Sequence, residues 1–342
     1  MTDFRKGQFA EHIPIFFNVD GLPLHVIGMY KGCSGFLVSN GPSLKTIDLK
    51  ALQQPGIVTI GVNNGPSVFR PNLHVCGDQP GRFIKSIWLD PKIQKVVPLS
   101  SFGSQLWDNE SWEVLTRDGK PLLVKECPNV VGIHRNDHFE PEQWLYEPTF
   151  GWGNSGKNGG CRTVFLLAIK VMFVLGIRKL FIVGADMKML AGEDTGYAFA
   201  QVRCSGATRM NNNAYRKINK RCAMLKPYFD REGFRVYNAT KDSGLTAFPY
   251  MPLEDALRVA TAGFSAANAR CHDRTEDSYL TLDHPAKLGL PPDAVARLDD
   301  KGKKNYARRD KEWFERMVAY KKDGKTHLIP KSFLAKHKDF LK

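Results

Sequence analysis

The sequence predicts an α/β fold with a mostly parallel sheet and helices on both faces. Short apolar runs alternate with polar, helix-compatible stretches in the first hundred residues, and the same alternation returns after residue 160. The runs are rich in Val, Ile and Leu, which is typical of strands buried on both faces. With 342 residues, of which 42% are hydrophobic, the chain can bury one large core of this kind.

The elements follow from these runs in chain order. In the first half we expect strands at 14–17 and 24–27, then a strand at 35–38, a helix at 43–53, and strands at 57–62, 73–77 and 94–99. In the second half we expect a helix at 163–175, a strand at 179–184, a helix at 211–232, a strand at 234–238 and a helix that opens at 253. Between 100 and 150 the pattern loosens into polar sequence with scattered aromatics, which we interpret as either a lid or insertion, or surface loops anchored by aromatic side chains.

The turn after the strand at 35–38 is the most informative segment. Its glycine lets a ligand come close to the backbone, its proline fixes φ near a helix start, and its serine can cap a helix whose first N–H groups hold an anion. The following strand also ends in two asparagines, and open α/β sheets bind nucleotides at such strand ends. We therefore expect a nucleotide pocket formed by Asn40, Gly41, Pro42, Ser43, Asn63 and Asn64.

A glycine-rich loop precedes the apolar helix at 163–175. It nearly matches a Walker A loop, but Asn158 stands where Ser or Thr should bind Mg²⁺, and 144–150 is a poor buried strand. The loop is either a cradle of free N–H groups for a phosphate, with Lys157 as a contact, or simply a flexible connection. The candidate binding residues are Asn154, Ser155, Gly156, Lys157, Gly159 and Gly160.

Two carboxylates also follow predicted strands. Asp78 comes after the strand at 73–77, and Asp186 follows the strand at 179–184. Each either contacts a substrate hydroxyl or caps a turn. The seven cysteines have no C-x-x-C pair or other metal-ligand spacing, which favours scattered core thiols in a reducing, cytoplasmic setting. The longest apolar run, at 164–176, is too short to span a bilayer.

The run Asn40-Gly41-Pro42-Ser43-Leu44, followed by a strand ending at Asn63, resembles the motif that opens two related Rossmann-like families. One comprises bacterial sialyltransferases that use CMP-linked sugars. The other comprises pterin-pyrophosphokinase-like proteins, including flagellar glycosylation accessory factors. The order helix, glycine, strand and Gly-x-Asp up to Asp186 is similar as well. The resemblance spans roughly residues 33–257 and is more specific for the fold than for the reaction.

The resemblance implies roles for further residues. Tyr197, in a Tyr-Ala-Phe segment, would hydrogen-bond the departing nucleotide phosphate, and Lys188 stands where the sialyltransferases carry a second phosphate-binding tyrosine. Their proposed general base, a histidine, has no counterpart, because no histidine occurs between His138 and His272. Either a carboxylate takes that role or the reaction differs. The catalytic candidates are Asp186, Tyr197, Lys188 and Asp78, with Asp194 as a further possible base.

Three function classes follow. The leading one is a glycosyltransferase that takes a nucleotide sugar as donor and transfers the sugar to an acceptor hydroxyl. The second is a pyrophosphokinase-like nucleotide-dependent transferase, which would need Mg²⁺ on carboxylates such as Asp78 and Asp186. The third is a catalytically silent module that binds glycan or nucleic acid. We expect the nucleotide-binding and transferase domain over residues 1–260.

The remaining residues, 261–342, are expected to form a basic helical appendage. The formal net charge of the chain is +14, and residues 301–342 alone hold fourteen Lys and Arg against five Asp and Glu. Such a tail, interleaved with aromatics, either tracks a nucleic-acid backbone or is a solvated helix. Nucleic acid with modified bases and glycan are therefore both candidate acceptors.

Overall fold

The structure is a computed structural model that describes residues 14–24, 26–108, 111, 113–153, 163–190, 196–199, 207–265, 318, 321–322 and 324. The chain divides into two compact units, one formed by 1–201 and 205–291 and the other by 202–204 and 292–342. The described residues up to 265 belong to the first unit. The predicted appendage, and with it the basic tail, lies almost entirely outside the described residues.

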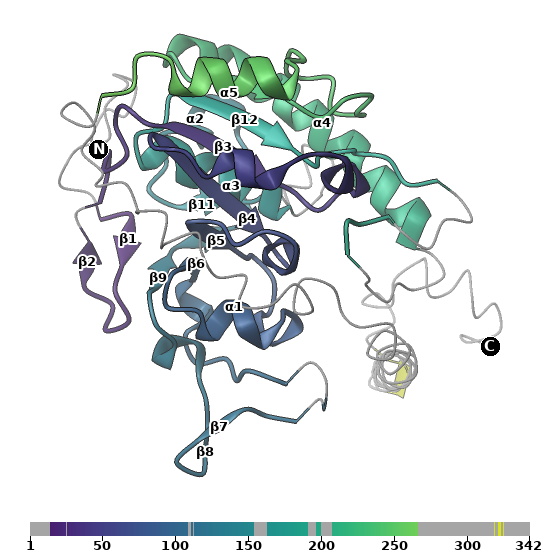
Figure 1. The fold of residues 1–342 in the computed structure, drawn as a ribbon. Helices are drawn as coiled ribbons and strands as arrows, with labels where there is room; N and C mark the ends of the chain where they lie inside the picture. The colour runs from purple at the N-terminus through teal and green to yellow at the C-terminus, as the bar shows by residue number, and fades with distance from the viewer. Residues whose placement is uncertain are drawn as a thin grey trace. The chain divides into compact units, whose positions relative to one another are not determined.

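One nine-stranded sheet forms the centre of the first unit, in the order β13-β12-β3-β4-β5-β6-β9-β1-β2 (Figure 1). The seven strands from β13 to β9 run parallel, and β1 and β2 pair antiparallel beyond β9. This confirms the predicted α/β class with a mostly parallel sheet. The strands are β1 Phe16–Phe17, β2 Pro23–Leu24, β3 Ser34–Val38, β4 Ile57–Val62, β5 Leu73–Val75, β6 Gln94–Pro98, β9 Val130–Ile133, β12 Lys179–Val183 and β13 Arg235–Asn238.

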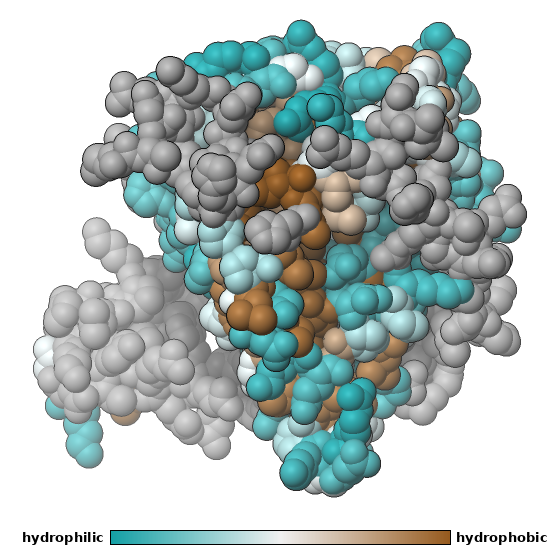
Figure 2. Space-filling view, turned by 90° about the vertical axis from the view of Figure 1, so that its left-hand side faces the viewer, coloured by the Kyte–Doolittle hydropathy of each residue, from teal (hydrophilic) through white to brown (hydrophobic). Residues whose placement is uncertain are grey.

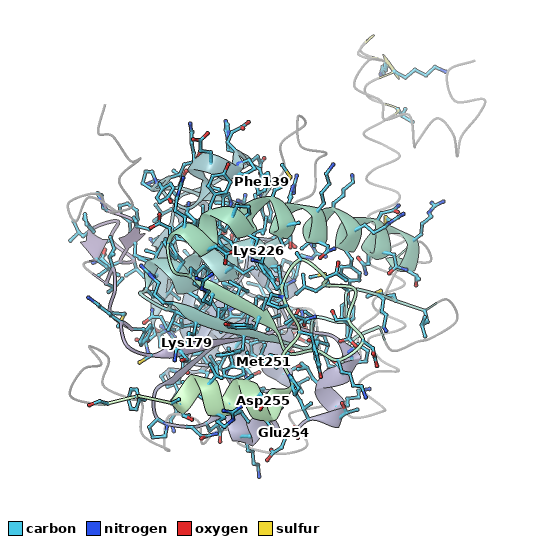
Figure 3. The ribbon with its side chains drawn as sticks, turned by 90° about the horizontal axis from the view of Figure 1, so that it is seen from above. Phe139, Lys179, Lys226, Met251, Glu254 and Asp255 are labelled. Atoms are coloured by element: carbon cyan, nitrogen blue, oxygen red, sulfur yellow. The ribbon has the colours of Figure 1, made fainter. Side chains whose placement is uncertain are left out.

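Helices cover both faces of this sheet, as Figure 3 shows for α4 and α5 on opposite sides. The largest core cluster joins α3 and α4 to one face, while α5 packs on the other face against β3. Thr163 caps α3 by accepting a hydrogen bond from the Phe165 N–H (3.1 Å), and Gly176, with φ of 99°, follows its end. The helices are α1 Lys85–Leu89, α2 Pro141–Trp144, α3 Val164–Val174, α4 Ala207–Arg231 and α5 Leu253–Thr261.

Two predictions about local structure were wrong. The helix expected at 43–53 is a pair of short 3₁₀ segments, η2 (Pro42–Thr46) and η3 (Leu49–Leu52), because Ile47 is extended and Asp48 caps the second segment. The loose region at 100–150 contributes β9 to the main sheet, where three of its four residues are buried and the strand pairs with β6 despite its polar flanks. It also holds two small sheets, formed by β7 (Thr116–Arg117) with β8 (Lys120–Pro121) and by β10 (Arg135–Asn136) with β11 (Phe150–Gly151).

Two aromatics of this region, Trp144 and Tyr146, are buried in the core. Trp144 is fully buried, and its indole N–H donates to the Gly151 carbonyl (2.7 Å). Lys170 on α3 is fully buried beneath the same segment, and its ammonium donates to the carbonyls of Trp144, Glu147 and Thr149. Burial lowers the pKa of Lys170 to about 7. One buried lysine therefore fixes the path of 144–149.

The β1–β2 edge leaves apolar groups at the surface. Leu22, between these strands, is 60% exposed, and Met29 is 36% exposed. Figure 2 shows apolar surface on this side of the molecule. Among the described residues, no helix is long and apolar enough to cross a membrane.

The direction of the chain through the sheet reverses beside β3. From β3 the strands proceed through β4, β5 and β6 to β9, and the chain then returns to place β12 on the opposite side of β3. In open α/β sheets, ligands bind in the crevice outside the carboxyl ends of the strands at such a switch point. The fold therefore predicts a ligand site at the carboxyl ends of β12, β3 and β4.

Candidate functional site

Two asparagines lie just beyond the ends of adjacent strands at this crevice. The register pairs Val38 of β3 with Gly61 of β4, and continuing it two residues brings Asn40 opposite Asn63. The amide oxygens of both side chains are buried and accept no hydrogen bond from any described residue. Buried polar atoms without partners are uncommon and call for an explanation. A ligand bound across the two strand ends would supply the missing contacts.

Asp186 occupies the position beside the 41–43 turn where the sequence predicts a bound anion. Its Oδ2 accepts hydrogen bonds from the Ser43 hydroxyl (2.7 Å) and the Ser43 N–H (3.4 Å). Gly41 is required for this approach, because a Cβ there would lie 1.8 Å from the same oxygen. The turn therefore holds the protein's own carboxylate, so a ligand phosphate must bind elsewhere in the crevice or displace Asp186.

The loop after β13 fixes the backbone of Asp186. The Gly244 N–H donates to the Asp186 carbonyl (2.8 Å), and the Ala185 N–H donates to the Thr240 hydroxyl (3.1 Å). The Ser243 hydroxyl donates to the Ala185 carbonyl. Gly41 adds a bond from its N–H to the Gly184 carbonyl (2.7 Å). Asp186 is thus held from two sides at the switch point.

Asn63 adopts a left-handed conformation, with φ of 52°, which asparagine tolerates better than most residues. His74 on β5 stabilises this turn, because its Nε2 lies 2.9 Å from the Asn63 carbonyl oxygen, which can only accept. His74 is fully buried with edge-on contacts to Phe83 and Trp88. Burial lowers its pKa to about 3, so the neutral ring with Nε2 protonated is the form that holds Asn63 in place.

The other two strand-end candidates of the first half serve the fold. The Asn64 amide oxygen accepts from the Ile84 N–H (3.0 Å), which ties the turn after β4 to the segment before α1. Asp78 is exposed and pairs with Arg82 (3.7 Å). β5, which precedes Asp78, lies three strands from β12, which precedes Asp186, and at about 4.8 Å per strand this separates the two strands by about 14 Å. The strand order therefore does not bring the two carboxylates together as ligands of one metal ion.

Tyr197 lies next to a residue that bonds to the chain just beyond β3. Its neighbour Ala198 donates its N–H to the Asn40 carbonyl (2.8 Å), and the Tyr197 hydroxyl accepts from the Asn211 amide (3.2 Å). The side-chain amide of Asn212 accepts a hydrogen bond from the Met189 N–H (2.8 Å) and donates one to the Met189 carbonyl (2.9 Å). Asn211 and Asn212 therefore position Tyr197 and the chain after Asp186.

Lys188 is exposed near this region, and its ammonium donates to the Asp242 carbonyl (2.5 Å). This bond fixes one end of the side chain to the loop that also holds Asp186. No contact between Lys188 and Tyr197 is observed among the described residues.

The glycine-rich loop begins and ends close to the same edge of the sheet. The Thr163 N–H donates to the Trp152 carbonyl (2.9 Å), so the two ends of the loop meet. A Cβ on Gly77, just after β5, would lie 2.7 Å from the Trp152 ring, and Arg135 stacks over that ring at 4.1 Å. The loop's candidates Asn154, Ser155, Gly156, Lys157, Gly159 and Gly160, and also Asp194, lie outside the described residues.

Two further features bear on ligand binding. In the part of the chain that the structure describes, no three His, Cys, Asp or Glu side chains gather as metal ligands would. A hollow of about 220 Å³ lies at the outer edge of β13, away from the crevice. Its wall carries Asp230, which pairs with both Lys226 and Arg235, a surface ion-pair cluster that stabilises the end of α4. The crevice is the stronger candidate site.

No family model, curated protein or solved structure with which we compared the chain matches it.

The residues that sequence reasoning missed act by supporting others. His74, Asn211 and Asn212 hold Asn63, Tyr197 and Met189 in place. The only sequence signal for the asparagines is a polar run at the start of an amphipathic helix. A histidine inside a short buried strand gives a weaker signal still, since core histidines are common.

Proposed function

We propose that this protein is a glycosyltransferase that binds a nucleotide sugar at the crevice outside β12, β3 and β4. The observation that carries the proposal is the pair of buried, unpartnered amide oxygens of Asn40 and Asn63 at adjacent strand ends. Leaving two such atoms unpaired costs about 1–3 kcal/mol each, which a bound nucleotide would recover. The position at a topological switch point and the resemblance of the Asn-Gly-Pro-Ser motif support the same conclusion.

In the proposed reaction the acceptor hydroxyl attacks the anomeric carbon of the donor sugar. The new bond joins the acceptor oxygen to that carbon, and the bond from carbon to the donor phosphate oxygen breaks with its electron pair leaving on the nucleotide. The acceptor proton passes to Asp186, whose position is fixed by Ser43 and Gly244. Tyr197 and Lys188 act on the leaving phosphate, one as a hydroxyl and one as a cation.

The geometry gives less support to a pyrophosphokinase-like reaction through Asp78 and Asp186. The strands that precede those carboxylates lie about 14 Å apart, which does not favour a Mg²⁺ ion held by both. The silent binding module differs from the transferase in one respect only, the absence of turnover. Incubation of the full chain with nucleotide sugars and acceptor, followed by detection of free nucleotide, separates the two.

Nucleotide binding is the first test. CMP, UDP and ATP are titrated calorimetrically into the wild type and into Asn63→Gly, which removes the amide but suits the left-handed backbone. We expect the substitution to weaken binding by about 1–3 kcal/mol. Asn129→Gly is the matched control, because Asn129 has a similar φ of 53° and lies at the opposite end of the strands, before β9. Equal binding by the two variants would refute the assignment of Asn63.

A further inference from the structure

The outward side of α4 carries positive charge and begins at the candidate site. Six Lys or Arg precede the first carboxylate of this helix, Asp230. Four of the six are exposed and lie within three turns, while the buried side of the helix joins the core through Ile218, Cys222, Leu225 and Phe229. The exposed four are Arg209, Arg216, Lys217 and Lys220.

Three of these four cations lack an ion-pair partner among the described residues. Arg209, Arg216 and Lys220 form no ion pair with any residue that the structure describes, and Arg216 bonds only to the amide of Asn213. Side chains ending in nitrogen project from α4 away from the sheet in Figure 3. From Arg209 to Lys220 the helix rises about 17 Å, which is enough to meet two or three successive phosphates of a nucleic-acid strand.

The same helix forms one wall of the site. Asn211 contacts the Tyr197 hydroxyl, and Asn212 holds Met189, three residues after Asp186. Exposed Met210 and Leu190, 54% and 57% exposed, lie beside these contacts. A strand that follows the cations of α4 toward its first turn therefore arrives at the crevice, where a base or sugar hydroxyl can enter.

We infer that the outward side of α4 binds the phosphate backbone of a single-stranded nucleic acid and leads it to the crevice as the acceptor. The role of the bound strand as acceptor rests on the proposed function, whereas the binding of nucleic acid to α4 does not. Phosphate contacts from Lys and Arg supply sequence-independent affinity, and a single strand can turn a base out of its stack toward the site. A lipid surface fits less well, because the apolar side of α4 is buried in the core.

The test compares two triple substitutions in the full chain. Arg209→Gln, Arg216→Gln and Lys220→Gln neutralise the α4 surface and keep helix propensity. Arg117→Gln, Lys120→Gln and Lys125→Gln remove the same charge from exposed residues at and near the β7–β8 hairpin. Fluorescence anisotropy then measures the binding of labelled single-stranded DNA of about 20 nucleotides, in salt from about 0.05 to 0.2 M.

We expect the α4 triple to weaken DNA binding at least about tenfold and to reduce the salt slope by about two, at about 0.7 per lost phosphate contact. The hairpin triple should stay close to the wild type. Equal effects of the two triples would overturn the inference. So would an α4 triple that loses binding to mixed phosphatidylcholine–phosphatidylserine vesicles but keeps DNA binding.

Calorimetry of nucleotide binding on the same proteins separates this inference from the proposed function. A protein that binds DNA through α4 but no nucleotide would leave the surface assigned and refute the transferase. A protein that binds nucleotide at the crevice, but whose DNA binding does not depend on α4, would refute this inference and leave the nucleotide site assigned.

Discussion

Gly41→Ala tests the contact that organises the crevice. A Cβ at Gly41 would lie 1.8 Å from Oδ2 of Asp186 and 2.6 Å from the carbonyl oxygen of Gly184, whereas real Cβ atoms essentially never come within 3.0 Å of another heavy atom. Gly41 has φ of −72° and ψ of 156°, which alanine adopts readily, so the effect comes from the contact alone. Asp186 must retreat by about 1 Å, which breaks its bond to Ser43.

The cost follows from these contacts. Crowding of this kind destabilises a protein by about 1–3 kcal/mol, and loss of a hydrogen bond to a carboxylate by about 1.5–3 kcal/mol. Alanine also reduces the conformational entropy of the unfolded chain, which stabilises the folded protein by about 0.4–1 kcal/mol. Because Asp186 is only half-buried, we expect a net loss of about 2–4 kcal/mol in the free energy of unfolding. Nucleotide binding should weaken with it, since Asn40 precedes the displaced turn.

Urea unfolding followed by circular dichroism measures the first effect and calorimetry the second. Gly103→Ala is the control, because no heavy atom lies within 4 Å of its Cβ position. Adding Asp186→Ala to Gly41→Ala should restore part of the stability and none of the turnover. If Gly41→Ala and Gly103→Ala unfold alike, the packing of Gly41 on Asp186 is wrong.

Two further predictions concern buried cationic and titratable groups. Lys170→Met leaves three carbonyls without their donor and should lower the free energy of unfolding by at least about 3 kcal/mol. Lys179→Met should cost less than half as much, because among the described residues the Lys179 ammonium donates to the Val259 carbonyl alone. The pKa of His74 is about 3 in the folded protein, below the usual 6.5. Between these two pH values the unfolded chain binds a proton that the folded protein does not. The free energy of unfolding therefore decreases as pH falls through that range, by up to about 1.4 kcal/mol per pH unit. His74→Gln should flatten this part of the pH profile of urea unfolding, and an unchanged slope would show that other groups govern it.

The sequence alone determined the α/β class, the seven central strands apart from β9, and the asparagines at two strand ends. Those features are local: apolar runs of strand length, a glycine or proline at a turn, and a periodic helix each leave a signal within a few residues. β9 escaped because its four residues lie in polar sequence and are recruited by pairing with β6. The two 3₁₀ segments escaped because their ends depend on Asp48 and on packing against the sheet.

Only the tertiary structure decided what those residues do. Residues 43 and 186 are far apart in the chain, so nothing local could show that the Asp186 carboxylate fills the turn predicted to hold a phosphate. Strand order, which sequence periodicity does not encode, placed β12 beside β3 and left β5, which precedes Asp78, three strands from β12. His74 supports Asn63, and Asn211 supports Tyr197, through contacts between different elements. Such contacts form when strands and helices pack, because packing brings distant residues within hydrogen-bonding range.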